Sequence, residues 1–293
     1  MITSSDFMHP EDAAALEQLE NIPGFPAFVK KILQLGLEQM QYGINMASSI
    51  RLSPTQLPEL YNRLPPICEK LGIEVPEFYL QMNPTPNAWT FGDTRKYITI
   101  TSGLVDLLTE RELDAVLAHE CGHIICRHVL YHSIANYILR GIDSLGVLGL
   151  CTVPMQYAIL YWYRKSELSC DRVGAFITDP ETAAYTEARL AGGPSSVTKD
   201  INLEEWAKQA DAYEEIRTDG VWNKALQVYA IAAQTHPFSA VRVREVLKWS
   251  KTEQYKRIVE YLNSSKDSVR CPRCGNVIQN TWCYCKFCGE KIV

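Results

Sequence analysis

Two histidines and a glutamate have the spacing of a metal-dependent hydrolytic site. The stretch from Val116 to Ile125 contains the pattern His-Glu-x-x-His, formed by His119, Glu120 and His123. On an α-helix, residues four apart lie about 40° beyond one full turn, so both imidazoles project from one face. Two such histidines can bind one zinc ion, and Glu120 could then take a proton from water that zinc activates. The pattern predicts a zinc-dependent hydrolase, although two histidines placed by chance on a helix would have the same spacing.

Elements upstream of this pattern would position it. Thr109-Glu-Arg-Glu112 is a capping box, which predicts that a helix begins there and continues through His123. Residues 77–82, 88–92 and 96–101 contain β-branched and aromatic residues and are predicted to form strands. An exposed edge of that sheet could hold an extended peptide by main-chain hydrogen bonds, although a purely structural sheet fits the same pattern.

A catalytic zinc site needs one more protein ligand, because such sites use three side chains and one water. The metzincin pattern would require glycine and histidine where this chain has Cys126 and Val129, which excludes that class. Glu167 begins a Glu-x-x-x-Asp pattern, in which Glu167 and Asp171 share one face of a helix. Glu167 could bind the metal while Asp171 hydrogen-bonds a ligating imidazole. Two solvated carboxylates would give the same pattern.

Residues 144–163 contain no charged side chain and are long enough to span a membrane. Pro154 would interrupt a helix in the middle of this run. His123 and Glu167 lie on either side of the run and must meet at one metal, which a single membrane crossing would prevent. We therefore expect a buried helical hairpin, or an apolar patch that makes peripheral contact with a membrane.

The region from about Glu74 to Val246 resembles peptidase family M48, the group that contains HtpX-type and CAAX prenyl protease-type zinc endopeptidases. The resemblance covers just over half of the chain. Four motifs carry it: Asn87-Ala88-x-x-x-Gly92, Leu-Ala-His119-Glu120-x-Gly122-His123, Ser166-Glu167-Leu-Ser-Cys-Asp171-Arg172, and Thr235-His236-Pro237 followed by Arg242.

The resemblance implies a gluzincin-type protease domain and assigns a role to each matched residue. His119, His123 and Glu167 would bind the catalytic zinc, and Glu120 would be the general base. Asp171 would lie behind a zinc ligand and support it. His236 would take part in catalysis, and Asn87 and Arg242 would bind substrate. The chain departs from the family at Cys170, where a small residue is usual, and in lacking clear membrane helices in its first third.

The expected mechanism is hydrolysis of a peptide bond by water that zinc activates. Glu120 would accept the proton of this water and later pass it to the leaving amine. His236 is the candidate donor to the developing oxyanion, although a histidine held at a helix start by Pro237 has the same sequence. Two further histidines, His128 and His132, are interpreted as structural.

Two Cys-x-x-Cys-Gly motifs near the end of the chain predict a second metal site. The four cysteines would bind a structural zinc, and the glycine after each pair lets backbone amides turn toward the sulfurs. An iron site or reactive thiols are the alternatives. Basic and aromatic residues nearby could bind nucleic acid, but their local excess charge is small, so we favour a tail that binds a protein partner or recruits substrate. The predicted ligands are Cys271, Cys274, Cys285 and Cys288.

Composition is consistent with a globular protein, since 46% of the 293 residues are hydrophobic and 22% are charged. The net charge of −5 gives no reason to expect nucleic acid as the main partner. The N-terminus lacks the features of a signal peptide, and the ten cysteines do not form an even disulfide framework. A cytoplasmic location, with membrane association as an option, is therefore expected.

The predicted fold class is α+β and mostly α-helical, with a small β-sheet beside the active-site helix and a small C-terminal zinc ribbon. Helices are expected at 26–50, 203–217, 221–234 and 239–262. The predicted domains are a protease domain over 1–262, with a helical part over about 1–72 and a catalytic core over about 73–250, a linker over 263–270, and a ribbon over 271–293.

The leading functional hypothesis is a zinc-dependent metalloendopeptidase that acts on polypeptides and holds two zinc ions, one catalytic and one structural. The alternative is a protein-binding or chaperone-like adaptor that keeps the metalloprotease fold but hydrolyses little. A nucleic-acid-binding regulator is disfavoured by the charge. The presence of Glu120 beside both histidines favours the enzyme, because a binding module has no physical need of a general base.

Overall fold

The computed structural model describes residues 2–34, 36–139, 152–218, 238–266, 268–279 and 284–291. The chain forms two compact units, Met1–Trp249 and Ser250–Val293, hereafter unit 1 and unit 2. Unit 1 is mostly helical with one four-stranded sheet, which confirms the predicted fold class. The predicted domain boundaries, with the protease domain ending at 262, stay a prediction.

The sheet of unit 1 has the strand order β1-β2-β4-β3. Its strands are β1 (Ile50–Arg51), β2 (Glu77–Gln81), β3 (Ala88–Phe91) and β4 (Tyr97–Thr101), and only the β2–β4 pairing is parallel. The three strands expected from the sequence are therefore confirmed, and the two-residue β1 is additional. Among the described residues β3 pairs only with β4 and forms an edge of the sheet. Gly92 makes the tight turn after β3, because a Cβ there would meet the Arg95 carbonyl oxygen at 2.0 Å.

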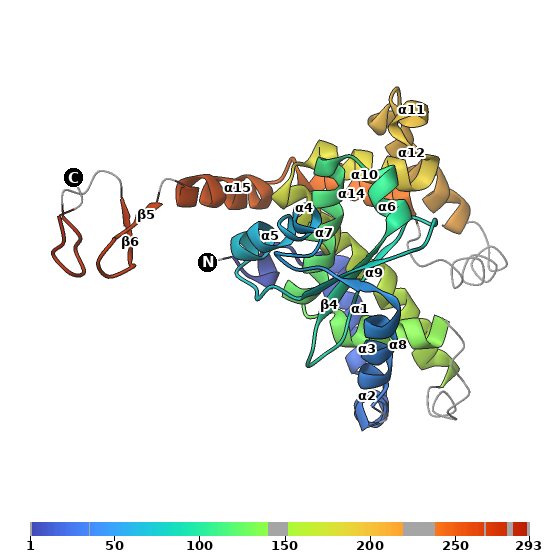
Figure 1. Ribbon diagram of the computed structural model, residues 1–293. Coiled ribbons are helices and arrows are strands. Elements are labelled where there is room, and N and C mark those ends of the chain that lie inside the picture. Colours follow the sequence, from blue (N-terminus) through green and yellow to red (C-terminus); the bar gives the residue numbers. More distant parts are fainter. Residues whose placement is uncertain are drawn as a thin grey trace. The chain divides into compact units, whose positions relative to one another are not determined.

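Helix α9 (Val153–Ile177) is the central helix of unit 1 (Figure 1). It contacts α7 (Glu110–Ile125), α1 (Pro10–Glu20), α10 (Pro180–Gly192) and α14 (Ser239–Trp249). The predicted capping box starts α7 as expected. The main hydrophobic core joins α1, α2 (Phe25–Gln34), the sheet, α8 (Val129–Leu139) and α9, and its members include Leu19, Phe28, Tyr97, Ile134 and Trp162.

The other described elements are the short 3-10 helix η1 (Ser4–Asp6), α2 (Phe25–Gln34), α3 (Leu37–Ser48), α4 (Pro58–Tyr61), α5 (Leu64–Leu71), α6 (Ser102–Leu107), α8 (Val129–Leu139), α11 (Ser195–Thr198), α12 (Leu203–Thr218), α15 (Glu253–Lys266), β5 (Ser268–Arg270) and β6 (Val277–Gln279).

Two long helices expected from the sequence are each divided in the structure. The segment predicted as one helix over 26–50 forms α2 and α3, because Gly36 before α3 has a left-handed backbone with φ of 65°. The segment over 239–262 forms α14 and α15. The helix predicted over 221–234 lies outside the described residues. Apolar spacing shows which residues face a core, but it does not show where the chain turns between two packed helices.

The apolar run over 144–163 is only partly described, since residues 140–151 lie outside the described part of the chain. From Val153 onward it forms the first half of α9, and Pro154 lies in the first turn of that helix, where proline is tolerated. The second half of the same helix carries Glu167. None of the described helices is both long and apolar enough to span a membrane.

A glycine on each helix allows α7 and α9 to approach closely. A Cβ on Gly122 of α7 would lie 2.9 Å from the Cα of Cys170 on α9, and a Cβ on Gly174 of α9 would lie 3.1 Å from the carbonyl oxygen of Ala115 on α7. Distances this short leave no room for a methyl group at Gly122. The two helices that carry the candidate site are therefore held at a separation that glycine makes accessible.

We expect Gly122→Ala to destabilise the protein by about 1–3 kcal/mol, because the added methyl group would force α7 away from α9. Thermal and urea unfolding would measure this loss. Gly43→Ala is the matched control, since Gly43 is also helical and a Cβ there meets no atom within 4 Å. The control should raise stability by up to about 1 kcal/mol, as alanine favours helix. If Gly122→Ala and Gly43→Ala changed the stability equally, the close approach of α7 and α9 would be contradicted.

Candidate active site

Helix α7 brings the residues of the His-Glu-x-x-His pattern to a buried site in unit 1. His119, Glu120 and His123 are 7%, 2% and 3% exposed. The Nε2 atoms of both imidazoles face the carboxylate of Glu167 on α9. His119 Nε2 lies 3.4 Å from one carboxylate oxygen, and His123 Nε2 lies 3.6 Å from the other. The structure thus brings together the three side chains predicted to bind zinc.

The spacing and the electrostatics of these three side chains fit a zinc ion. In a tetrahedral site with bonds of about 2.0–2.1 Å, neighbouring ligand atoms lie about 3.3–3.4 Å apart. His119 Nε2 is buried and has no hydrogen-bond partner among the described residues. Burial opposes a charge on His119, but Asp171 and Glu167 outweigh it and raise its pKa to about 10. The two acidic neighbours of His119 therefore favour a positive charge at this position, which a bound cation could supply in place of a proton.

The second imidazole is held in the neutral form that binds metals. Burial, together with the nearby His132, lowers the pKa of His123 well below its ordinary value. A ligating imidazole must be neutral to offer its lone pair to a metal. His123 therefore meets this requirement, and at His119 a bound cation would take the place of the proton that Asp171 and Glu167 favour.

Asp171 and Arg242 form a buried charged cluster behind His119. Asp171 Oδ1 lies 2.9 Å from His119 Nδ1. Arg242 of α14 donates two hydrogen bonds to Asp171, from Nε at 2.8 Å and from Nη2 at 2.5 Å, and its Nη2 also lies 3.1 Å from Glu187. Burial raises the pKa of a carboxyl group, but the charge of Arg242 outweighs it at Asp171 and lowers that pKa, whereas burial dominates at Glu187 and raises it. The arginine holds the acid that orients His119.

Glu120 lies between the edge strand β3 and a pocket. The Thr90 hydroxyl on β3 donates to the Glu120 carboxylate at 2.6 Å and contacts its carbonyl oxygen at 3.0 Å. The sheet edge is therefore beside the active-site helix, as expected from the sequence. The pocket opens next to His119 and Glu120, and its other lining residues include Asn87, Leu104, Val116, Leu190 and Arg242.

Of the three residues predicted for substrate binding and catalysis, two line the pocket and one lies outside the described residues. Asn87 lines the pocket at the start of β3, and its side-chain oxygen accepts a hydrogen bond from the Ala88 amide. Arg242 lines the same pocket while its guanidinium group pairs with buried acids. His236 lies outside the described residues.

A buried cluster not expected from the sequence adjoins His123. The sulfur of Cys170 lies 3.2 Å from His123 Nδ1 and 3.6 Å from His128 Nδ1. The ring of His132 packs at a tilt of 49° against that of His123, with ring centroids 4.0 Å apart, and His132 Nε2 lies 2.6 Å from the Ser166 hydroxyl. The interpretation of His128 and His132 as structural residues agrees with their complete burial, but their direct contact with the metal site was not foreseen.

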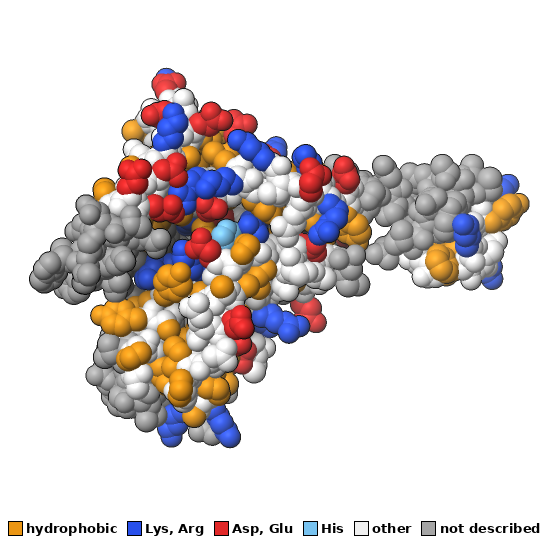
Figure 2. All heavy atoms as spheres, turned by 180° about the vertical axis from the view of Figure 1, so that it is seen from behind, with side chains coloured by type: hydrophobic (Ala, Val, Ile, Leu, Met, Phe, Trp, Pro, Cys, Tyr) orange, Lys and Arg blue, Asp and Glu red, His pale blue; other side chains and the backbone are white. Residues whose placement is uncertain are grey.

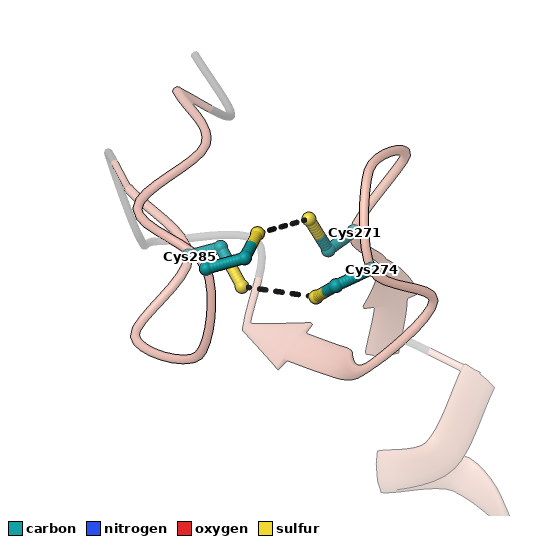
Figure 3. A group of neighbouring side chains, drawn as sticks. Cys271, Cys274 and Cys285 are labelled. Atoms are coloured by element: carbon teal, nitrogen blue, oxygen red, sulfur yellow. Dashed lines mark hydrogen bonds between the residues drawn. The ribbon is translucent and has the colours of Figure 1, made fainter.

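Unit 2 brings the four ribbon cysteines together (Figure 3). All four sulfurs lie within 4.8 Å of one another, with 3.5 Å between Cys271 and Cys288 and 3.6 Å between Cys274 and Cys285. Tetrahedral zinc with Zn–S bonds of about 2.3 Å needs sulfurs about 3.8 Å apart. The four thiols therefore fit one tetrahedral metal.

The chain is similar to a family of peptidases. The sequence model described as "Peptidase family M48" matches residues 55–250. A relative from Arabidopsis thaliana, "Plastoglobule-localized metallopeptidase 48, chloroplastic", is 33% identical over 270 residues, which cover 89% of this chain and 77% of the relative. A "Protease HtpX homolog" of Trichormus variabilis is 26% identical over 236 residues, which cover 68% and 76% of the two chains. The crystal structure of S. mikatae Ste24p aligns with a TM-score of 0.46 at 14% identity, over 80% of this chain and 60% of that one.

Proposed function

The chain belongs to peptidase family M48 and is a metallopeptidase, and we propose that His119, His123 and Glu167 bind its catalytic zinc while Glu120 is the general base. The observation that supports this most strongly is the convergence of both Nε2 atoms on the Glu167 carboxylate. The Glu167 carboxylate would be the third protein ligand of a catalytic zinc site, which leaves the fourth coordination position for water.

The chain's own residues divide the chemistry between them. When bound, zinc would lower the pKa of a water molecule at this site and stabilise negative charge on the scissile carbonyl. Glu120 accepts a proton from that water and later donates it to the leaving amine. The Thr90 hydroxyl orients the Glu120 carboxylate, and Asp171 orients His119 from behind. His236 stays the proposed donor to the oxyanion.

The substrate is a polypeptide, and we propose that it lies along β3 and places a side chain in the adjoining pocket. An edge strand offers main-chain hydrogen bonds to an extended peptide. The pocket walls formed by Leu104, Val116 and Leu190 favour an apolar substrate side chain. Asn87 immediately precedes β3 and lines the pocket, which supports its proposed role in substrate binding. Replacing Leu190 with aspartate should turn preference away from apolar side chains in a peptide-library assay; unchanged preference would refute the assignment.

We propose that the four ribbon cysteines bind a second, structural zinc. The supporting observation is the mutual approach of their sulfurs in a segment too short to build its own core. A role of this ribbon in binding a protein partner or recruiting substrate stays a prediction, which removal of residues 271–293 followed by cleavage assays on a protein substrate would test.

The location of the protein also stays a prediction. We propose that it lies in the cytoplasm and makes peripheral contact with a membrane through residues 144–163. Figure 2 shows hydrophobic side chains gathered on the lower part of unit 1. Tyr157 and Tyr161, four residues apart on α9, are among the exposed large side chains of the chain. If the protein did not float with liposomes, the proposed membrane contact would be refuted.

Metal content tests the two proposed zinc sites separately. We expect wild-type protein to contain two zinc ions per chain, and Glu167→Ala and Cys285→Ser to contain one each, measured by mass spectrometry of metals after gel filtration. The Glu167 variant should lose peptide cleavage, whereas the Cys285 variant should keep its catalytic zinc. A wild-type protein with one zinc, or a Glu167 variant with two, would refute the corresponding site.

A further inference from the structure

Both histidines of α7 have their second ring nitrogen held by α9. His119 Nδ1 contacts Asp171, and His123 Nδ1 contacts the sulfur of Cys170 at 3.2 Å. Glu167, Cys170 and Asp171 follow one another at intervals of three and one, so they share one face of α9. One helix face therefore supplies the third ligand and a partner for each of the two imidazoles.

The thiol lies on the side of His123 opposite to the metal position. Nε2 of His123 faces Glu167, and the two nitrogens of an imidazole point in divergent directions. A neutral His123 that offers Nε2 to zinc must carry its proton on Nδ1. Nδ1 then donates to the sulfur of Cys170, which fixes the tautomer and the ring orientation. The position that a carboxylate takes beside His119 is thus taken by a thiol beside His123.

The Cys170 thiol has an acceptor for its own proton. Its sulfur lies 3.6 Å from His128 Nδ1, within the reach of a hydrogen bond in which the thiol donates to the imidazole. On its far side, His128 Nε2 lies 3.1 Å from Asp12 Oδ2, which is an ion-pair distance without hydrogen-bond geometry. His128 would accept at Nδ1 and carry its proton on Nε2, which faces the Asp12 carboxylate.

Asp12 is a fixed negative charge at the end of this series. It belongs to α1 and is completely buried. Besides the contact with His128, its carboxylate accepts hydrogen bonds from Trp162 Nε1 at 3.0 Å and from the Ser169 hydroxyl at 2.5 Å. Burial opposes its ionisation, but these donors and His128 outweigh it and lower the pKa of Asp12. A buried carboxylate that accepts two hydrogen bonds and lies beside an imidazole polarises the groups that contact it.

We propose that Asp12, His128 and Cys170 form a polar relay, with hydrogen bonds through the thiol and an ion-pair contact to Asp12, that orients the zinc ligand His123, so that Cys170 is a positioning residue for the catalytic zinc. This inference rests on the proposed function, since it requires His123 to bind zinc. Groups that hold the far nitrogen of a ligating histidine fix its tautomer and raise its basicity. The relay also gives α1, which is far from α7 in sequence, a direct effect on metal binding.

The first test measures zinc affinity of the full chain in zinc buffers set by a chelator, with bound zinc counted at each free concentration. Cys170→Ala should weaken binding of the catalytic zinc by about 10–100-fold. Cys170→Ser, which keeps a donor and an acceptor, should stay within a few-fold of wild type. Cys126→Ala is the matched control, because Cys126 is also buried and no side-chain hydrogen bond to it is present among the described residues. The ribbon zinc is common to all variants.

The second test asks whether Asp12 acts through the thiol. Asp12→Asn should weaken zinc binding in the wild-type background and have little further effect when combined with Cys170→Ala. Equal effects in both backgrounds would refute the relay. Nitrogen-15 spectra of histidine-labelled wild type provide a measurement that needs no variant. They should show His123 protonated at Nδ1 and His128 protonated at Nε2, and the opposite tautomer at either histidine would refute the relay.

The outcomes separate this inference from the proposed function. If wild type binds only the ribbon zinc, the proposed catalytic site is wrong. If wild type binds two zinc ions and Cys170→Ala behaves like Cys126→Ala, the catalytic site stands and the relay alone is wrong. If cobalt substitution shows a thiolate band that Cys170→Ala removes, Cys170 is a metal ligand, which also overturns the relay.

Discussion

Glu120→Gln is expected to lower kcat/KM for peptide cleavage by about 10²–10⁴-fold while leaving two zinc ions bound, because the change removes a general base and no metal ligand. Glutamine has nearly the same shape, so it can still accept the hydrogen bond from Thr90. It cannot take a proton from water. The loss should therefore appear mainly in kcat, with the metal content and the unfolding temperature close to those of wild type.

A second buried glutamate on the same helix provides the control. Glu112 is 5% exposed and pairs with Arg189 at 3.1 Å, and neither residue lines the pocket. Glu112→Gln should reduce stability, since it weakens this ion pair and the capping box at Thr109. Its kcat/KM should stay near the wild-type value. Equal cleavage by wild type and Glu120→Gln would refute the role of Glu120 as the base, and equal loss in both glutamate variants would indicate a structural effect.

The parts of the site that the sequence predicts are those fixed by spacing along one helix. His119 and His123 share a face because of their separation, and Glu167 and Asp171 share a face for the same reason. The contact between the two helices was expected because Glu167 completes the ligand count of a catalytic zinc. Family resemblance then indicated Arg242, and the structure places it against Asp171.

The parts that the sequence does not predict depend on side chains brought together from distant elements. Thr90 reaches Glu120 across the sheet edge, and Glu187 meets Arg242 across α10 and α14. Neither residue belongs to a motif, so no local signal marks it. Asp12 is a first-turn acid of α1, a position where acids are common on exposed helices, and only the packing of α1 on α9 buries it. One signal was available at Cys170, where the chain departs from the family at a position next to Asp171.

Arg242→Met is expected to destabilise unit 1 by about 3–5 kcal/mol, because it leaves buried carboxylates without their countercharge. The guanidinium group is within hydrogen-bond or ion-pair distance of Asp171 and Glu187, and it lies 3.9 Å from Glu167. Methionine replaces the volume but not the charge. Urea unfolding would measure the stability, and the zinc-buffer titration would show weaker binding of the catalytic zinc, since Asp171 would no longer be held against His119.

The control for Arg242 lies two residues away on the same helix. Arg244 also contacts acidic side chains, but Asp211, Glu214 and Glu245 are 64%, 45% and 19% exposed, so water can reach each of them when the arginine is removed. Arg244→Met should therefore cost only about 1 kcal/mol. Arg242→Lys gives a further distinction, because lysine keeps the charge but cannot form the paired hydrogen bonds to Asp171. If Arg242 mainly binds substrate, Arg242→Lys would raise KM at unchanged stability and zinc affinity. If it mainly holds Asp171, both stability and zinc affinity would fall, and we expect this second result.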